Sequence, residues 1–303
     1  MIPRVWLPTV ALAAVVLLAS PPVFGQFSFK TGVDVAAFGV SVLGRDGDPV
    51  SGLSATDFEV REDGVPQTVS YFSPGSADDA PPLHIGLLFD TSASMEKDLA
   101  FSRNAAVRFL NLFPKAEDFT LVEFSDAVRA GRFTQAEFAR LVERIRTGKA
   151  KGKTALYDAL SVYLGSAFDQ DGRKVLVLYT DGGDTSSSRT WTEAQRLLRT
   201  SDVTVYPIGF IEHMGAGRMV QQTQLMDVAK ITGGRAVFPG TMKDLEPVYA
   251  RIAREINAQY VLGYVPTNSV RDGKWRKVEI RLTTPESKRL DVRVREGYFA
   301  PVK

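Results

Sequence analysis

The chain has 303 residues, of which 44% are hydrophobic and 24% are charged, and its formal net charge is +2. This composition is typical of a globular protein that buries a sizeable core, and the charge is too small to indicate a nucleic acid or an anionic membrane surface as a partner. The sequence contains no cysteine, which excludes disulfides, a lipid-modified cysteine, thiolate metal sites and cysteine nucleophiles.

The N-terminal segment has the features of an export signal. One arginine precedes a nearly uninterrupted apolar stretch over residues 6–19, which is shorter than the ~20 residues that a membrane-spanning helix needs. Small residues at Val23 and Gly25 favour cleavage before Gln26. We therefore predict a signal peptide over residues 1–25 and an exported protein, either periplasmic or secreted. The alternative is an uncleaved N-terminal anchor, which would be the only source of membrane contact.

Residues 83–266 alternate apolar runs with amphipathic helical patterns. The apolar runs predict strands covered on both faces, and they are HIGLLFD, FTLVEFS, KVLVLYTD, VTVYPIGF and YVLGYVP. The helical patterns cover residues 99–113, 154–168 and 242–259. This alternation predicts an α/β domain with a doubly wound, mostly parallel sheet flanked by helices.

Residues 26–76 and 267–303 have the pattern of antiparallel strands. An Asp-Gly pair separates two short alternating runs in FEVREDGVPQTVSYF, which predicts a hairpin. The sequence WRKVEIRL alternates strictly between polar and apolar residues, as half-buried strands do. Neither flank has enough strands for a core of its own. We predict that both flanks pair into one small antiparallel β-domain, with the α/β domain inserted between them; the alternative is two separate β-extensions packed on the α/β core.

Hydroxyl and carboxylate side chains follow two of the predicted strands. Asp90, Ser92 and Ser94 come directly after the first apolar run, Thr154 lies in a loop that opens a helix, and Asp181 ends a later run. Ligands of doubly wound sheets bind beyond the carboxyl ends of the strands, and oxygen ligands of this kind suit Mg²⁺, Mn²⁺ or Ca²⁺. Asp90 and the serines could instead serve only as a helix N-cap, but that does not account for the matching residues in the other two stretches.

The D-x-S-x-S pattern, the downstream threonine and the later aspartate together resemble the metal-ion-dependent adhesion site of von Willebrand factor A (VWA) domains. The flanks also resemble those of exported bacterial VWA-related proteins. The resemblance implies that Ser92, Ser94 and Thr154 ligate a Mg²⁺-type ion directly, while Asp90 and Asp181 act mainly through water. It further implies that an Asp or Glu carboxylate of a partner protein completes the coordination of the ion.

These features predict an adhesion-type binding module and not an enzyme. The alternatives are a metal-assisted hydrolase that uses Asp90 or Asp181 as its base and a structural envelope scaffold without bound metal. The stretch TGKAKGKT is one residue short of the P-loop spacing, so no nucleotide is expected. The G-x-S-x-G motif of α/β-hydrolases is absent from the sequence. We expect His84 to be structural and His213 to be a polar loop residue.

Overall fold

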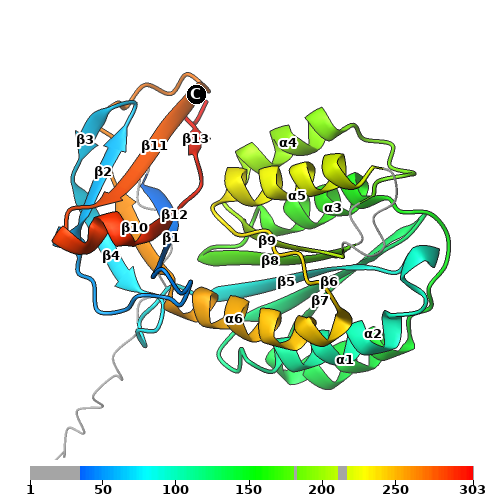
Figure 1. Ribbon diagram of the computed structural model, residues 1–303. Helices are drawn as coiled ribbons and strands as arrows, with labels where there is room; N and C mark the ends of the chain where they lie inside the picture. Colours follow the sequence, from blue (N-terminus) through cyan, green and yellow to red (C-terminus); the bar gives the residue numbers. More distant parts are fainter. Residues whose placement is uncertain (1–34, 181–182, 211–216, 303) are drawn as a thin grey trace, which may run out of the picture.

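The computed structural model describes residues 35–180, 183–210 and 217–302. These residues form two lobes, an α/β domain and a β-sandwich (Figure 1). The predicted signal peptide, Asp181 and His213 lie outside the described residues. Within the described ranges, no helix has the length and apolar character needed to cross a membrane.

The α/β domain is built on a sheet with the strand order β7-β6-β5-β8-β9. The strands are β5 (Leu83–Asp90), β6 (Asp118–Phe124), β7 (Val128–Thr134), β8 (Arg173–Thr180) and β9 (Thr204–Gly209). All neighbours are parallel except β7, which runs antiparallel to β6 at the edge. The chain passes from β5 to β6 on one side and later returns to β8 on the other, so the strand order reverses at β5. The predicted doubly wound, mostly parallel sheet is confirmed.

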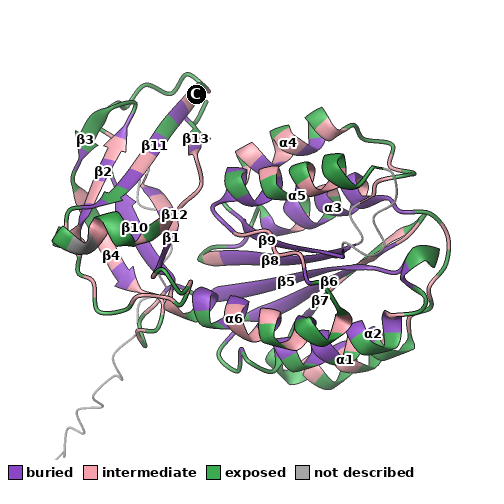
Figure 2. Ribbon diagram, viewed as in Figure 1, coloured by how far each residue is buried: buried purple, intermediate pink, exposed green. Residues whose placement is uncertain are grey.

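Helices cover both faces of this sheet (Figure 1). One face carries α1 (Leu99–Leu110), α2 (Phe138–Thr147) and α6 (Leu245–Ala258), and the other carries α3 (Leu156–Ala167), α4 (Trp191–Thr200) and α5 (Arg218–Thr232). Side chains of β5 alternate between the two cores, with Leu87 and Phe89 in one and Leu88 in the other. The central strands are therefore buried along their length (Figure 2), which explains their continuous apolar runs.

Two four-stranded sheets form the β-sandwich, with the orders β12-β1-β10-β4 and β13-β11-β2-β3. The strands are β1 (Ala36–Leu43), β2 (Phe58–Glu62), β3 (Val65–Gln67), β4 (Val69–Pro74), β10 (Tyr260–Tyr264), β11 (Trp275–Leu282), β12 (Asp291–Arg293) and β13 (Gly297–Phe299). β1 pairs with β12, and β2 pairs with β11. Strands from both ends of the chain thus share each sheet, and the predicted small antiparallel β-domain built from both flanks is confirmed.

The β2–β3 hairpin turns at the predicted Asp-Gly pair. Asp63 has φ 48° and Gly64 has φ 84°, so both residues are in the left-handed region. A two-residue hairpin loop with this geometry favours Asp-Gly, because aspartate tolerates a positive φ and glycine adopts it without steric cost. Short 3₁₀ turns complete the secondary structure at Ala55–Asp57, Ala93–Met95, Gln135–Glu137, Met242–Asp244 and Pro285–Arg289.

The apolar run YVLGYVP was expected in the α/β domain, and this expectation is wrong. The run forms β10, which lies antiparallel between β1 and β4 in the β-sandwich. Tyr260, Leu262 and Tyr264 point into the sandwich core, while a side chain at Gly263 on the other face would meet Tyr71 and Val35. A strand that is buried on both faces has the same continuous apolar pattern in a parallel and in an antiparallel sheet. The sequence pattern alone therefore could not assign this strand to one of the two lobes.

The stability of both lobes should depend on pH above the neutral range, because burial raises the pKa of several tyrosines. These are Tyr163, Tyr206, Tyr249, Tyr264 and Tyr298. Tyr264 and Tyr298 each donate a hydrogen bond of 2.8 Å to Oε2 of Glu62, which adds to the cost of ionising them.

Below about pH 10 these phenols are neutral in both the folded and the unfolded chain, so their contribution to stability is complete. Above that pH the unfolded chain ionises first, and the free energy of unfolding should fall by about 1.4 kcal/mol per phenol for each pH unit. Urea unfolding at a series of alkaline pH values, followed together with tyrosinate absorbance, checks this. Ionisation of these tyrosines near pH 10 in a chain that stays folded would contradict it.

Candidate functional site

Asp90 ends β5 and is fully buried at the point where the strand order reverses. Its Oδ1 accepts a hydrogen bond of 2.9 Å from the backbone N–H of Ser92, and its Oδ2 accepts one of 2.8 Å from the hydroxyl of Thr180. Thr180 is the last residue of β8. The carboxylate is therefore fixed between the carboxyl ends of two neighbouring strands, which is where doubly wound sheets bind ligands.

The DTSAS segment makes a short turn before helix α1. Ser92 is buried and Ser94 is exposed, and their hydroxyl oxygens lie 3.0 Å apart. Ser92 precedes the 3₁₀ turn Ala93–Met95, but its side chain makes no capping hydrogen bond there. Helix α1 begins only at Leu99. The capping alternative therefore does not account for these hydroxyls.

The loop between α2 and α3 is attached to the DTSAS turn by backbone hydrogen bonds. The N–H of Lys151 donates to the carbonyl of Thr91 at 2.8 Å, and the N–H of Ala93 donates to the carbonyl of Gly152 at 3.1 Å. These two bonds bring Thr154, two residues further on, to the same end of the sheet as Asp90. The structure thus brings together the four predicted site residues that it describes.

Thr154 is held by its backbone and keeps its hydroxyl available. Its N–H donates to Oγ1 of Thr185 at 2.9 Å, and its carbonyl accepts from the N–H of Thr185 at 2.8 Å. The residue is only 4% exposed, yet within the described residues its hydroxyl makes no hydrogen bond. This hydroxyl is therefore available to a ligand that binds through oxygen.

The donor chemistry of the site fits a hard cation. Three hydroxyls and the Asp90 carboxylate supply only oxygen atoms, as Mg²⁺, Mn²⁺ or Ca²⁺ require. Among the residues that the structure describes, no group of three or more His, Cys, Asp or Glu side chains could hold a metal ion. The candidate site is instead built mainly on hydroxyl groups.

Two further carboxylates near the site hold the loop that follows β8. Asp184 accepts from the N–H of Tyr157 at 3.3 Å and from the hydroxyl of Ser187 at 2.5 Å. Asp158 accepts from the N–H groups of Ser188 at 2.8 Å and Arg189. Both carboxylates tie this loop to the first turn of α3.

Sequence reasoning missed Thr180 and Thr185. Thr180 donates to Asp90, and Thr185 makes two hydrogen bonds with the backbone of Thr154. A hydroxyl at the end of an otherwise apolar strand was a usable signal for Thr180. No sequence signal distinguishes Thr185 from the hydroxyl residues that follow it, because its role depends on how the loop after β8 folds back.

His84 lies at the opposite end of β5 from Asp90. Its Nδ1 is 3.1 Å from Oδ2 of Asp118, and its Nε2 is 2.8 Å from the carbonyl oxygen of Asp171. Gln170 donates to the same Asp118 carboxylate. The imidazole is thus part of a buried polar network that joins strand ends, in agreement with the structural role expected for it.

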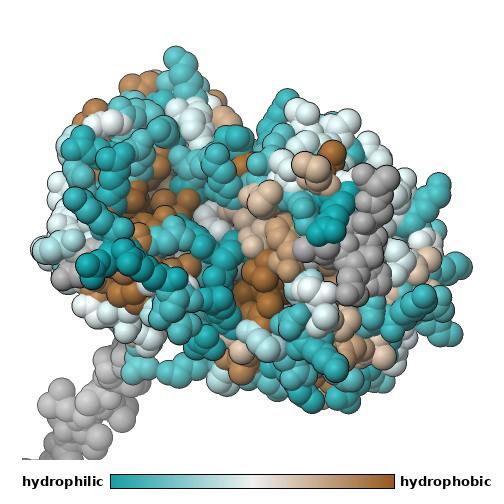
Figure 3. All heavy atoms as spheres, in the orientation of Figure 1, coloured by the Kyte–Doolittle hydropathy of each residue, from teal (hydrophilic) through white to brown (hydrophobic). Residues whose placement is uncertain are grey.

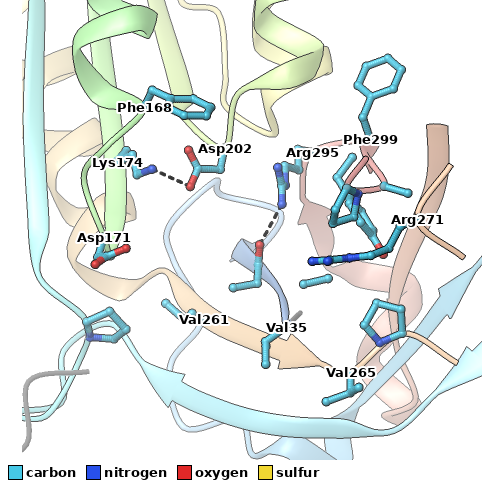
Figure 4. A pocket seen from close by; sticks show the side chains of 18 of the residues that line it. Val35, Phe168, Asp171, Lys174, Asp202, Val261, Val265, Arg271, Arg295 and Phe299 are labelled. Carbon is cyan, nitrogen blue, oxygen red and sulfur yellow. Dashed lines mark hydrogen bonds and ion pairs between the residues drawn. The ribbon is translucent and has the colours of Figure 1, made fainter. Parts of the chain in front are cut away.

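A cavity of about 680 Å³ lies where the two lobes meet. Hydrophobic residues are visible in the hollow between the lobes (Figure 3), and charged side chains from both lobes line the cavity (Figure 4). Lys174 pairs with Asp202 at 2.8 Å, and Arg295 donates to the carbonyls of Ala37 at 3.0 Å and Ser201 at 3.3 Å. Of these contacts, only the one between Arg295 and Ser201 crosses the junction, and none of the candidate site residues that the structure describes lines the cavity.

Solved structures that are similar to this chain include proteins of bacterial pili. The PilB minor pilin of Streptococcus sanguinis is 14% identical with a TM-score of 0.49, and the match covers 60% of this chain and 63% of the pilin. The pilus adhesin SpaC of Lactobacillus rhamnosus GG is 12% identical with a TM-score of 0.50, over 81% of this chain and 48% of SpaC. The chain therefore spans less than two thirds of either protein.

A third structure matches over nearly its full length. The vWF domain of the type V pili tip protein Mfa5 from Porphyromonas gingivalis is 13% identical with a TM-score of 0.50, over 59% of this chain and 96% of that domain. At these identities, the two matches with a TM-score of 0.50 show the fold alone. A comparison with curated protein sequences finds no match.

The family comparison covers the lobe that carries the candidate site. Residues 84–250, more than half of the chain, match the model of the von Willebrand factor type A domain. This range begins in β5 and ends in α6, and it contains Asp90 and the serine and threonine residues of the candidate site. The chain belongs to the von Willebrand factor type A domain family.

Proposed function

We propose that this protein is an exported binding module that engages an acidic residue of a partner protein through a Mg²⁺-type ion. Ser92, Ser94 and Thr154 would hold the ion through their hydroxyls. Asp90, and Asp181 outside the described residues, would act mainly through water molecules. The observation that carries the proposal is the hydroxyl of Thr154, which makes no hydrogen bond within the described residues and belongs to a loop bonded to the DTSAS turn.

The charge balance of this donor set supports recognition of a carboxylate. Neutral hydroxyls leave most of the charge of a bound divalent ion uncompensated, and Asp90 already accepts two hydrogen bonds from the protein. A bound ion would therefore supply a strong electrostatic contact for an incoming Asp or Glu side chain. Mg²⁺ keeps several waters when protein ligands are few, and one of these positions would be available to the partner.

Binding is favoured over catalysis by the groups around the site. The hydrolase alternative requires Asp90 or Asp181 as a base, but both oxygens of Asp90 accept hydrogen bonds in a fully buried position. His84 is engaged at the opposite end of the strand. The pilus adhesin and the pilus tip protein that share the fold support an extracytoplasmic location as part of the same proposal.

The substitution Asp90→Asn should weaken binding of Mg²⁺ or Mn²⁺ by about 10- to 100-fold. The amide can still accept from the N–H of Ser92 and contact Thr180, so the fold should persist while the negative charge is lost. Calorimetric titration of the purified protein with each metal, after treatment with EDTA, measures the effect. Asp158→Asn is the matched control, because it removes the same charge from a carboxylate that holds the loop after β8. This variant should bind the metal with an affinity close to that of the wild type. Equal affinities of Asp90→Asn and the wild type would overturn the proposal.

A further inference from the structure

A run of unpaired cations borders the candidate metal site. The sequence RTGKAKGK, residues 146–153, contains one arginine and three lysines and no acid. Lys149, Lys151 and Lys153 are exposed, and in the described part of the chain their ammonium groups form no ion pair or hydrogen bond. Exposed cations elsewhere do pair, as Lys115 and Arg108 do with carboxylates at 3.0 and 2.6 Å. The positive charge of this loop is therefore concentrated, and within the described residues its three lysines are not paired with an acid.

The loop is held in place at both ends. Arg103 of α1 donates from Nη1 to the carbonyl of Arg146 at 3.1 Å and from Nη2 to the carbonyl of Gly148. At the other end, Lys151 and Gly152 make the backbone hydrogen bonds to the DTSAS turn described above. The lysines therefore border the site in a fixed position, because the backbone that carries them is bonded to the metal-site turn itself.

Gly152 allows this close approach. Its φ is 82°, and a Cβ at this position would lie 2.5 Å from Oδ1 of Asp126. A side chain here would be strained by its backbone conformation and would also collide with the Asp126 carboxylate. Glu123 also lies beside the loop, at Gly148, but it is paired with Arg144 at 2.9 Å. The two acids therefore offset only part of the charge of the four cations.

We propose that the partner segment recognised at this site carries several acidic residues around the carboxylate that meets the metal ion. This inference rests on the proposed function. The ion would take one carboxylate, while Lys149, Lys151 and Lys153 would attract its acidic neighbours and raise the association rate. The net charge of the whole chain is only +2, so this attraction is local to one rim of the site. It would select an acidic protein segment over a neutral one that presents a single Asp or Glu.

The test compares two labelled peptides by fluorescence anisotropy in Mg²⁺. One is a glycine-serine peptide with a single aspartate, and the other has the same aspartate flanked by glutamates. Three exposed ionic contacts, each of them weak, should together make the acidic peptide bind about tenfold more tightly. This preference should become smaller as the salt concentration is raised. The triple substitution Lys149→Gln, Lys151→Gln and Lys153→Gln should abolish it while metal binding by calorimetry persists.

The matched control is the triple substitution Lys274→Gln, Lys277→Gln and Lys288→Gln, which removes the same charge from exposed positions of the β-sandwich lobe. This control should keep the tenfold preference. A preference that survives in the variant with Lys149, Lys151 and Lys153 replaced would overturn the inference, as would failure of both peptides to bind the wild type.

Two further outcomes separate this inference from its alternatives. The acidic peptide could bind equally well in EDTA and in Mg²⁺, and lose this binding in the variant with Lys149, Lys151 and Lys153 replaced. That result would contradict the metal-dependent function and leave only attraction by the lysines. Single-stranded DNA and anionic phospholipid vesicles serve as other polyanions. Binding of either one as tightly as the acidic peptide would overturn the selection of an acidic protein segment.

Discussion

Replacing Gly86 by alanine should lower the free energy of unfolding by about 3 kcal/mol. Gly86 lies in the middle of β5, and a Cβ there would come within 2.2 Å of Cε2 of Tyr163 and 2.4 Å of its hydroxyl oxygen. The ring of Tyr163 is 1% exposed, and its hydroxyl donates to the carbonyl of Val175 at 3.3 Å. Because the ring is enclosed, the added methyl group should force α3 away from β5.

The same displacement should affect the site. Thr154 lies two residues before α3, and Asp90 ends β5, so a shift between this helix and this strand separates them. Urea unfolding measures the loss of stability, and metal titration measures the effect on the site. Gly165→Ala is the matched control, because it adds a methyl group to α3 in open space and should stabilise the helix by up to ~1 kcal/mol.

A second variant tests the stated cause. If the clash is with the ring, Tyr163→Leu should reduce the cost of Gly86→Ala, so that the double variant is less destabilised than the sum of the single variants. Strict additivity of the two substitutions would show that Tyr163 is not the cause. Wild-type stability of Gly86→Ala alone would show that the packing of α3 on β5 is not as tight as the structure indicates.

The sequence predicted most strands of the α/β lobe and three of its helices because their signals are local, but α2, α4 and α5 were not predicted. Four of the five apolar runs are strands of the parallel sheet, and the helical patterns lie on α1, α3 and α6. β7 escaped prediction because it is an antiparallel edge strand with only one fully buried residue, Phe133. β10 was assigned to the wrong lobe because burial on both faces, and not the type of sheet, determines an apolar run.

The placement of four candidate site residues could be predicted from the sequence, but the hydrogen bonds that hold them could not. Asp90, Ser92, Ser94 and Thr154 were identified from their positions after strands and in loops, and the structure places them at one end of the sheet. The bonds that hold them join segments distant in sequence. Thr180, for example, is 90 residues from Asp90. The space that Gly86 leaves for Tyr163 likewise exists only once the helix packs on the strand.

The variant Thr154→Val should lose metal binding with little change in the stability of the metal-free protein. Valine keeps the branched shape of threonine, and the hydroxyl that it removes makes no hydrogen bond within the described residues. The free energy of unfolding in EDTA should therefore change by less than ~1 kcal/mol. Metal affinity should fall by at least about tenfold, because one direct ligand is lost.

Thr154→Ser provides the control for this substitution. It retains the hydroxyl at the same position and should bind metal with an affinity close to that of the wild type. Calorimetric titration of the three proteins distinguishes loss of the hydroxyl from loss of the methyl group. Similar weakening in the serine and valine variants would mean that packing of the methyl group, and not ligation, links Thr154 to the metal.

Thermal melting of the wild type and of Thr154→Val, in EDTA and in Mg²⁺ or Mn²⁺, is the most direct test that this VWA domain binds a divalent cation at the hydroxyl site. Metal at about ten times its dissociation constant should stabilise the wild type by ~1.4 kcal/mol, which raises its melting temperature by about 2–4 °C. The account predicts this rise in the wild type and its absence in Thr154→Val at the same metal concentration. Equal rises in both proteins, or no rise in the wild type at ~10 mM metal, would contradict it.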